Sequence, residues 1–210
     1  PRVMAGPGDV AESVFDPDMV ALFQEFLDTG RACRARESSR PSPRPYHYMV
    51  RDTEQKGLCL RDGHLVATSL QGANAALEGG CPSWGVGDTP PEAPPHRRVP
   101  PEPISVVPNR HLERRRCPLI VGIRGGTRAL SCGTGPEPQL HLEDVELLHL
   151  FSREGDEATP YTFYKTFGGS THTFEAAAFP GLFLSTAPAE GEVLGLAPPP
   201  GATAFYLHRR

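Results

Sequence analysis

The chain has 210 residues, of which 38% are hydrophobic, and a formal net charge of −4. A negative net charge argues against a general nucleic-acid-binding protein, because phosphate backbones attract positively charged surfaces. The sequence has no apolar run of about 18 residues, the length that predicts a membrane-spanning helix, and it does not start with the basic and apolar regions of a signal peptide. These properties predict one folded domain of about 150 residues with additional segments and no membrane insertion.

Residues 1–45 are predicted to be a pro-segment or linker that contains one short helix. Asp16-Pro17-Asp18 supplies a helix cap, a proline at the first helical position and an acidic first turn. Apolar residues then recur at helical spacing, which predicts a helix over about residues 16–29. This helix either packs on the domain or belongs to a removable pro-segment, and a dedicated partner-binding helix is the alternative.

The folded domain is predicted to span residues 46–210 and to consist of short strands. Alternating or apolar runs bounded by turn residues occur at 46–52, 58–61, 64–68, 104–108, 119–123, 129–132, 137–143, 162–167, 171–175, 183–184, 193–196 and 204–208. Asp62-Gly63 is a strong hairpin signal, Gly168-Gly169 is expected to supply positive φ angles, and Pro180-Gly181 fits a type II turn. About twelve strands of this kind predict an all-β barrel or sandwich, between which the periodicity does not choose.

Residues 79–103 interrupt this series of strands. The segment has no periodicity, is rich in proline and contains the single Trp of the chain. Loops of this length are either functional or unstructured. We therefore expect a disordered surface insertion, with a proline-rich docking site as the alternative.

Three segments resemble the interleukin-1 cytokine family. They are ISVVPNRHLE from Ile104, PLIVGIRGGTRALSCG from Pro118 and YTFYKTFGGSTHTFEAAAFPGLFLST from Tyr161. The last segment departs from the family at Leu182, where a Trp is usual. The resemblance covers about residues 46–208 apart from the insertion, and it implies a β-trefoil.

The resemblance also implies a function. It implies a secreted, monomeric cytokine that binds an interleukin-1-type receptor with immunoglobulin-like domains and modulates inflammatory and innate immune signalling. The motifs ISVVPNR and LEDV are most similar to the receptor-antagonist side of the family, in its interleukin-36 branch. Ala204 stands where some antagonists carry a charge, which leaves an interleukin-36-type agonist open. An unprocessed intracellular form is a further alternative.

Receptor-binding surfaces in this family are made of loops and strand edges. By position, the resemblance implies contacts from Arg51, Asp52, Gln55, Lys56, Asn109, Arg110 and His111. Each of these residues is otherwise explained as part of an ordinary solvated turn. Val50-Arg51-Asp52 matches an aliphatic-x-Asp motif that follows the mature N-terminus in the family. The resemblance therefore implies processing at Pro41, Ser42 and Pro43.

The five cysteines are odd in number and form no C-x-x-C pair, which favours reduced thiols over a disulfide framework or a zinc site. Such thiols suit a chain that is cytoplasmic before release, as in the family members that are secreted without a signal peptide. No G-x-S-x-G motif is present, and Ser170 and His172 are explained by strand alternation. His141, Glu143 and His149 lack the spacing of a metal site. We expect no enzyme, no cofactor and no metal.

Arg114-Arg115-Arg116 is the densest basic cluster in the predicted domain. Such a cluster is suited to heparin-like polyanions, whose sulfate and carboxylate groups are negatively charged. A solvated turn is the alternative interpretation.

Overall fold

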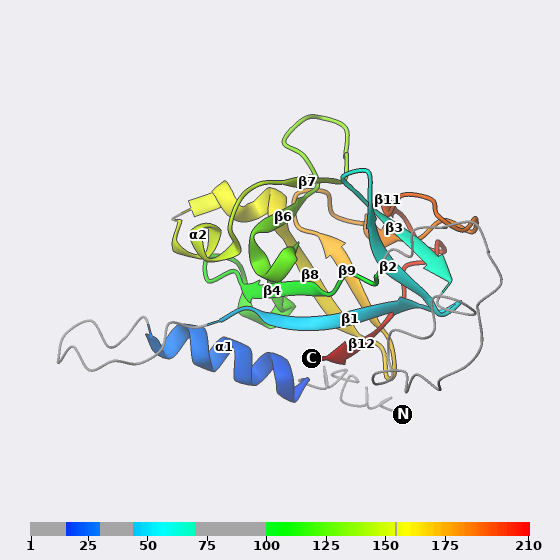
Figure 1. Cartoon of the computed structure of the whole chain (residues 1–210). Coiled ribbons are helices and arrows are strands. Elements are labelled where there is room, and N and C mark those ends of the chain that lie inside the picture. Colours follow the sequence, from blue (N-terminus) through cyan, green and yellow to red (C-terminus); the bar gives the residue numbers. More distant parts are fainter. Residues whose placement is uncertain (1–15, 30–43, 70–99, 154) are drawn as a thin grey trace, which may run out of the picture.

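The computed structural model describes residues 16–29, 44–69, 100–153 and 155–210 (Figure 1). Its strands are β1 (Tyr46–Asp52), β2 (Lys56–Arg61), β3 (His64–Ser69), β4 (Ile104–Pro108), β5 (Pro118–Ile123), β6 (Arg128–Ser131), β7 (His141–Glu143), β8 (Thr162–Phe167), β9 (His172–Ala176), β10 (Phe183–Ser185), β11 (Gly195–Ala197) and β12 (Phe205–Arg209). Its helices are α1 (Pro17–Thr29) and α2 (Leu147–Ser152), with 3₁₀ turns η2 (Arg114–Arg116), η3 (Arg124–Gly126) and η4 (Gly155–Tyr161). None of the helices in these ranges is long and apolar enough to cross a membrane.

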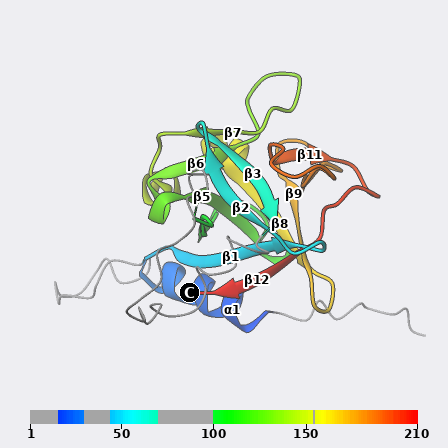
Figure 2. The same cartoon turned by 45° about the vertical axis from the view of Figure 1, so that its right-hand side comes forward.

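Six strands form a closed barrel. Each strand in the series β1, β4, β5, β8, β9 and β12 pairs antiparallel with the next, and β12 pairs with β1 to close the ring. The three hairpins β2–β3, β6–β7 and β10–β11 contribute the other strands (Figures 1 and 2). A six-stranded barrel with three hairpins, repeated as three four-strand units, is a β-trefoil. The predicted fold and strand number are confirmed.

The core fills the interior of this barrel. The largest fully buried side chains of the strands include Leu119, Ile120, Phe163, Phe174 and Phe205. They come from β5, β8, β9 and β12. Buried and half-buried residues alternate along β9, whereas every residue of β5 is buried. Burial of these side chains supplies the main favourable term in folding, about 25 cal/mol per Å² of apolar area removed from water.

The hairpins follow local turn chemistry. Asp62 and Gly63 have φ angles of 50° and 82°, as a type I′ turn requires, and Gly181 has a φ of 86°, as expected for the third position of a type II turn. The hairpin between β8 and β9 differs from the prediction. Its loop has four residues, and of its two glycines only Gly169 has a positive φ.

Two segments differ from the prediction. Residues 147–152 are not among the predicted strands, and they form the short helix α2. Leu147 and Leu150 are buried on one side of this helix, at helical spacing. The last residues of the predicted disordered insertion are bound to β2, since Pro101 bridges Cys59 and the Glu102 N–H donates to the Leu58 carbonyl at 2.7 Å. Residues 79–99 lie outside the described residues.

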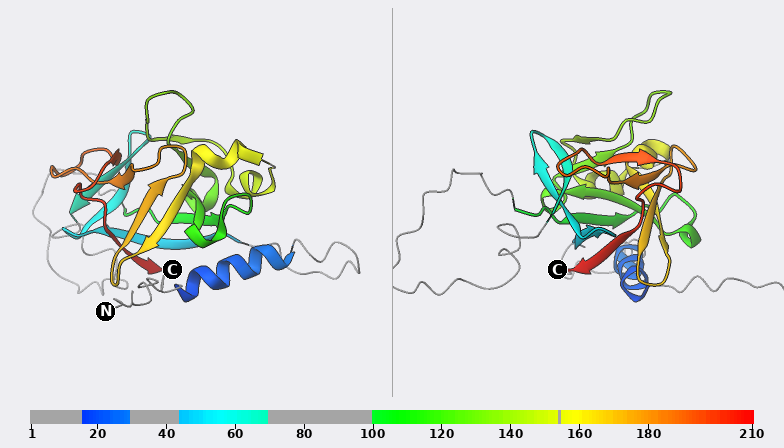
Figure 3. Two further views of the ribbon diagram at one scale, coloured as in Figure 1. Left: turned by 180° about the vertical axis from the view of Figure 1, so that it is seen from behind. Right: turned by 90° about the vertical axis from the view of Figure 1, so that its right-hand side faces the viewer.

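Helix α1 packs on the outside of the barrel, next to β1 and the C-terminal end of the chain (Figures 1 and 3). Its buried side chains are Met19, Leu22, Phe23 and Phe26. Their spacing places them on one face of the helix, which is the face that a surface helix turns toward a core. The structure thus shows α1 packed on the domain, and the removable pro-segment stays a prediction. The predicted processing region at residues 41–43 lies outside the described residues.

Candidate functional site

The first candidate group lies in the turn between β1 and β2. Asp52 is only 2% exposed, and its carboxylate accepts hydrogen bonds from the N–H groups of Glu54 (2.9 Å) and Lys56 (2.8 Å). It also accepts a bond from the Thr186 hydroxyl at 2.7 Å. Asp52 therefore fixes the turn from inside, and its oxygens are occupied by the fold.

Lys56 has a similar supporting role. Its ammonium donates to the Ala187 carbonyl at 2.7 Å and lies 2.9 Å from the Glu54 carboxylate and 3.5 Å from that of Asp52. The hydrogen bond that the Lys56 ammonium donates to Glu54, together with the two carboxylate charges, raises the pKa of Lys56, although burial lowers it. Gln55 is exposed and has a left-handed φ of 65°. The turn therefore presents Glu54 and Gln55 to solvent and keeps Asp52 and Lys56 inside.

Arg51 lies beside this turn, within the paired part of β1. Its register partners are Tyr206 on β12 and Gly57 on β2, and its side chain is half-buried. It is therefore placed at the edge of the exposed turn rather than in it.

The second candidate group begins the loop between β4 and β5. Asn109 is 2% exposed, its amide donates to the Thr162 hydroxyl at 2.9 Å, and its oxygen accepts from the His111 N–H at 2.9 Å. Arg110 and His111 are exposed, and the Arg110 guanidinium lies 5.4 Å from the centre of the Phe151 ring. Asn109 thus orients the loop, and its two neighbours are available to a partner.

The two groups lie at opposite ends of β1. Asp52 ends this strand, whereas Asn109 follows β4, whose Val106 pairs with Tyr46 at the start of β1. Six residues of extended chain span about 20 Å. No single small ligand bridges such a distance, so the candidate residues form two areas of a broad surface. Contact areas of this extent are typical of protein partners.

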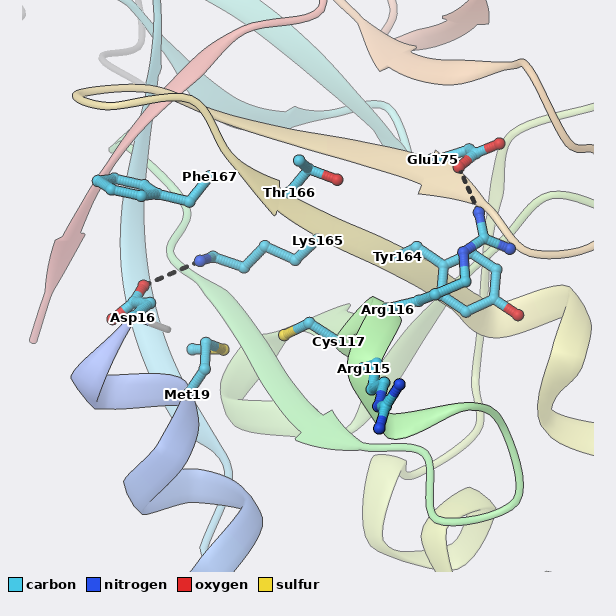
Figure 4. A pocket seen from close by; sticks show the side chains of 10 residues that line it. All are labelled: Asp16, Met19, Arg115, Arg116, Cys117, Tyr164, Lys165, Thr166, Phe167 and Glu175. Atoms are coloured by element: carbon cyan, nitrogen blue, oxygen red, sulfur yellow. Dashed lines mark hydrogen bonds and ion pairs between the residues drawn. The ribbon is translucent and has the colours of Figure 1, made fainter. Parts of the chain in front are cut away.

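A groove lies between α1, η2 and the hairpin of β8 and β9 (Figure 4). Its volume is about 180 Å³, and Asp16, Arg115, Arg116, Lys165 and Glu175 supply its charged groups. Two ion pairs cross it: Asp16 with Lys165 at 2.9 Å and Arg116 with Glu175 at 2.7 Å. Sequence analysis missed these pairs, because α1 and β8 are far apart in the chain. The acidic N-cap at Asp16 was the available signal.

Residues considered for catalysis or metal binding have structural partners. Glu143 accepts hydrogen bonds from the Tyr161 hydroxyl at 2.6 Å and lies 2.9 Å from the His141 Nε2. Burial and the bond to Glu143 raise the pKa of Tyr161 to about 12. His149 is exposed on α2, and no group of three potential metal ligands occurs among the described residues.

Cys117, Cys132 and His172 are held in their neutral forms. Burial raises the pKa of Cys117 to about 11 and also raises that of Cys132, whose thiol donates to the Pro160 carbonyl at 2.8 Å. Burial, with the charge of Lys165, lowers the pKa of His172 to about 4. Ser170 is exposed in the loop before it. A neutral thiol is a poor nucleophile, so these groups do not form an activated nucleophilic site.

Comparison with known proteins places the chain in a family. The profile of the family described as Interleukin-1 / 18 matches residues 102–199. Human interleukin-1 family member 10 is 34% identical over 172 residues, which cover 80% of this chain and 96% of that protein. The chain belongs to the interleukin-1 cytokine family. This confirms the resemblance found in the sequence.

Two human antagonists are also similar to this interleukin-1 family cytokine. Interleukin-36 receptor antagonist protein is 48% identical over 87 residues, which are 41% of this chain and 56% of that protein. The alignment therefore spans little more than half of that relative. Interleukin-1 receptor antagonist protein is 33% identical over 194 residues, which cover 90% of this chain and 92% of that protein. The similarity to the antagonist branch agrees with the sequence motifs.

Solved structures of the family share the fold. Chicken interleukin-1 beta has a TM-score of 0.57 at 23% identity, over 78% of this chain and 96% of that chain. The structure of interleukin-36alpha has a TM-score of 0.54 at 24% identity, over 83% of this chain and 99% of that chain. Family members are cytokines, and these structures support the β-trefoil independently of the strand pairing described above.

Proposed function

We propose that this chain is a secreted antagonist of an interleukin-1-type receptor, which it binds as a monomer through immunoglobulin-like domains of the receptor. The observation that carries the proposal is the similarity to human interleukin-1 receptor antagonist protein over 90% of this chain. The high local identity to interleukin-36 receptor antagonist protein favours a receptor of the interleukin-36 type. An antagonist occupies the primary receptor without recruiting the accessory receptor.

The geometry divides the candidate contacts into two roles. Gln55, Arg110 and His111 are exposed, and we assign them, with the edge residue Arg51, to contact with the receptor. Asp52, Lys56 and Asn109 are buried and hydrogen-bonded, so we assign them to positioning the two loops. Of the seven receptor contacts predicted by position, four are thus assigned to contact with the receptor and three to holding the two loops in place.

We further propose that processing at residues 41–43 separates α1 from the working ligand. All strands lie within residues 46–210, and α1 contributes no strand pairing to the barrel. Cleavage before β1 therefore leaves the barrel complete. Among the described residues, Cys117 and Cys132 are free thiols, which agrees with a cytoplasmic precursor released to the extracellular space.

The test is surface binding of the full chain and of a chain starting at Pro41 to an interleukin-36 receptor ectodomain, with and without the accessory receptor. We expect the trimmed chain to bind the primary receptor and to leave the accessory receptor unbound. Recruitment of the accessory receptor would make the chain an agonist. Absence of binding to every interleukin-1-type receptor would refute the ligand proposal.

Two substitutions refine this test. Gln55→Gly removes an exposed side chain at a position whose positive φ suits glycine, and Arg110→Ala removes the exposed guanidinium of the second area. Each should weaken receptor binding and leave the fold intact. Gln139→Ala, in the exposed loop before β7, is the matched control and should have no effect.

A further inference from the structure

The loop at residues 109–117, here called the basic loop, has a charge unlike that of the rest of the chain. It contains Arg110, Arg114, Arg115 and Arg116 but only one acidic residue, Glu113, whereas the whole chain has a net charge of −4. All four arginines are exposed. The remaining surface charges of this acidic protein are enough to keep it soluble. Solubility therefore does not explain a local excess of positive charge.

Aromatic rings position three of these arginines. The guanidinium carbon of Arg116 lies 3.8 Å from the centre of the Tyr164 ring, and that of Arg114 lies 5.5 Å from the Phe23 ring. Arg110 lies over Phe151, as described above. A guanidinium over a ring contacts it through its flat face, and N–H groups at the edge remain able to donate hydrogen bonds. These contacts restrict the side chains and so lower the entropy lost on binding an anion.

The 3₁₀ geometry of η2 spreads the arginines apart. Three residues complete one turn of such a helix, so consecutive side chains point in directions about 120° apart. Figure 4 shows Arg116 extended along Tyr164 toward Glu175, while Arg115 lies separately below Cys117. Among the described residues, Arg115 has no hydrogen bond or ion pair. Side chains that diverge in this way do not converge on one small anion, but they can contact successive groups of a long one.

The surroundings decide which polyanion fits. Single-stranded nucleic acids require exposed aromatic rings for base stacking, and here the rings of Tyr164 and Phe151 are covered by guanidinium groups. Insertion into a membrane surface requires exposed apolar side chains. The exposed large apolar side chains of the described residues are Leu148, Phe167 and Val193, none of which is in the basic loop. Sulfate and carboxylate groups need only the paired N–H donors that arginine supplies.

We propose that the basic loop binds a sulfated glycosaminoglycan chain, with Arg115 as its main contact. Arg110 and Arg116, positioned by Phe151 and Tyr164, are secondary contacts in every form of the chain. Arg114 adds its charge, and its position over Phe23 of α1 applies to the chain before processing. Glu113, Glu175 and Asp16 are the acidic groups on or beside this surface, and two of them are already paired, Glu175 with Arg116 and Asp16 with Lys165. This site is distinct from the first-turn receptor area and shares only Arg110 with the proposed receptor contacts. Such binding would retain the cytokine on extracellular matrix near its point of release.

The experiment measures affinity of the full chain for immobilised heparin at about 0.15 M salt and at higher salt. Arg115→Gln should weaken binding by about tenfold, the effect of one charge-assisted hydrogen bond, and Glu113→Gln should strengthen it. Arg61→Gln, at an exposed arginine of the β2–β3 hairpin, is the matched control and should change little. The affinity for heparin should fall as the salt concentration rises. Binding releases cations condensed on the polyanion, and this release is less favourable at high salt.

Several outcomes would overturn the proposal. They are no binding at about 0.15 M salt, equal binding to desulfated heparin, and an equal loss from Arg61→Gln. Stronger binding to single-stranded DNA or to phosphatidylserine vesicles would assign the loop to another ligand. Thermal unfolding of each variant is the control for a retained fold. Receptor binding of Arg115→Gln should equal that of the parent chain, which separates this proposal from the receptor proposal.

Discussion

The first turn and the basic loop are two exposed connections that are held in place by different forces. The first turn is organised by the buried carboxylate of Asp52, which accepts three hydrogen bonds and lies near the Lys56 ammonium. The basic loop is held by Asn109 at its start and by guanidinium groups lying over aromatic rings. The buried polar groups of the first turn are hydrogen-bonded within the fold. The arginines of the basic loop, in contrast, have N–H groups that can donate hydrogen bonds to a partner.

The largest expected effect follows from removal of the Asp52 carboxylate. Asp52→Ala leaves the Lys56 ammonium without one of its two carboxylates and leaves two backbone N–H groups of the turn without acceptors. We expect a loss of about 3–5 kcal/mol in the free energy of unfolding, measured with urea. Glu54→Ala is the control, because this side chain is 64% exposed, and it should cost under about 1 kcal/mol. Equal losses would contradict the supporting role of Asp52.

Asn109→Ala should have the next largest effect. It removes the bonds to Thr162 and to the His111 N–H from a site that is 2% exposed. The expected loss is about 1–3 kcal/mol, the range for leaving buried polar partners unsatisfied. Urea unfolding measures it, and Arg110→Ala, at the exposed neighbour, should cost less. If Arg110→Ala proved the more damaging, Asn109 would not be the residue that orients the loop.

The ion pair between α1 and the barrel predicts a dependence on pH. Burial raises the pKa of Asp16, but the hydrogen bond and the charge of Lys165 lower it by a larger amount. The pKa of Asp16 in the folded chain is therefore below the usual 3.8. A lowered folded-state pKa stabilises the docked helix fully above pH 3.8, and this contribution is lost as the pH falls through the folded-state value. Hydrogen exchange of the α1 amides measures the docking.

Asp16→Asn should speed this exchange by roughly tenfold near neutral pH, the effect of one charge-assisted hydrogen bond. The difference between the variant and the parent chain should shrink as the pH falls below 3.8 and through the lower pKa of the folded chain, where the parent carboxylate also becomes neutral. A difference that stays constant with pH would show that the charge of Asp16 does not hold the helix.

The smallest effect is expected at the ring beneath Arg116. Tyr164→Leu keeps an apolar side chain but removes the aromatic face, which should cost about 0.5–1 kcal/mol at this exposed site. A double-mutant cycle with Arg116→Gln isolates the interaction of the two side chains from their other contacts. A coupling energy of zero would mean that the ring does not position this arginine.

Local signals in the sequence determined most of the strands and turns. The alternation at 46–52 and the run at 104–108 coincide with β1 and β4 as observed, because strand period and turn residues act over a few neighbours. Asp62-Gly63 fixed its hairpin for the same reason, since both residues tolerate the positive φ angles that the turn requires. The β-trefoil and the receptor role came from resemblance to the family, not from periodicity.

Tertiary structure alone decided which polar residues are supports and which are exposed. Asp52 and Asn109 look like solvated turn residues in the sequence, yet each is buried because its partner, Thr186 or Thr162, comes from a strand or loop more than fifty positions away. Asp16 and Lys165, and the arginines and the rings beneath them, are also far apart in the chain. Periodicity describes neighbours along the chain, whereas closure of the barrel selects these contacts.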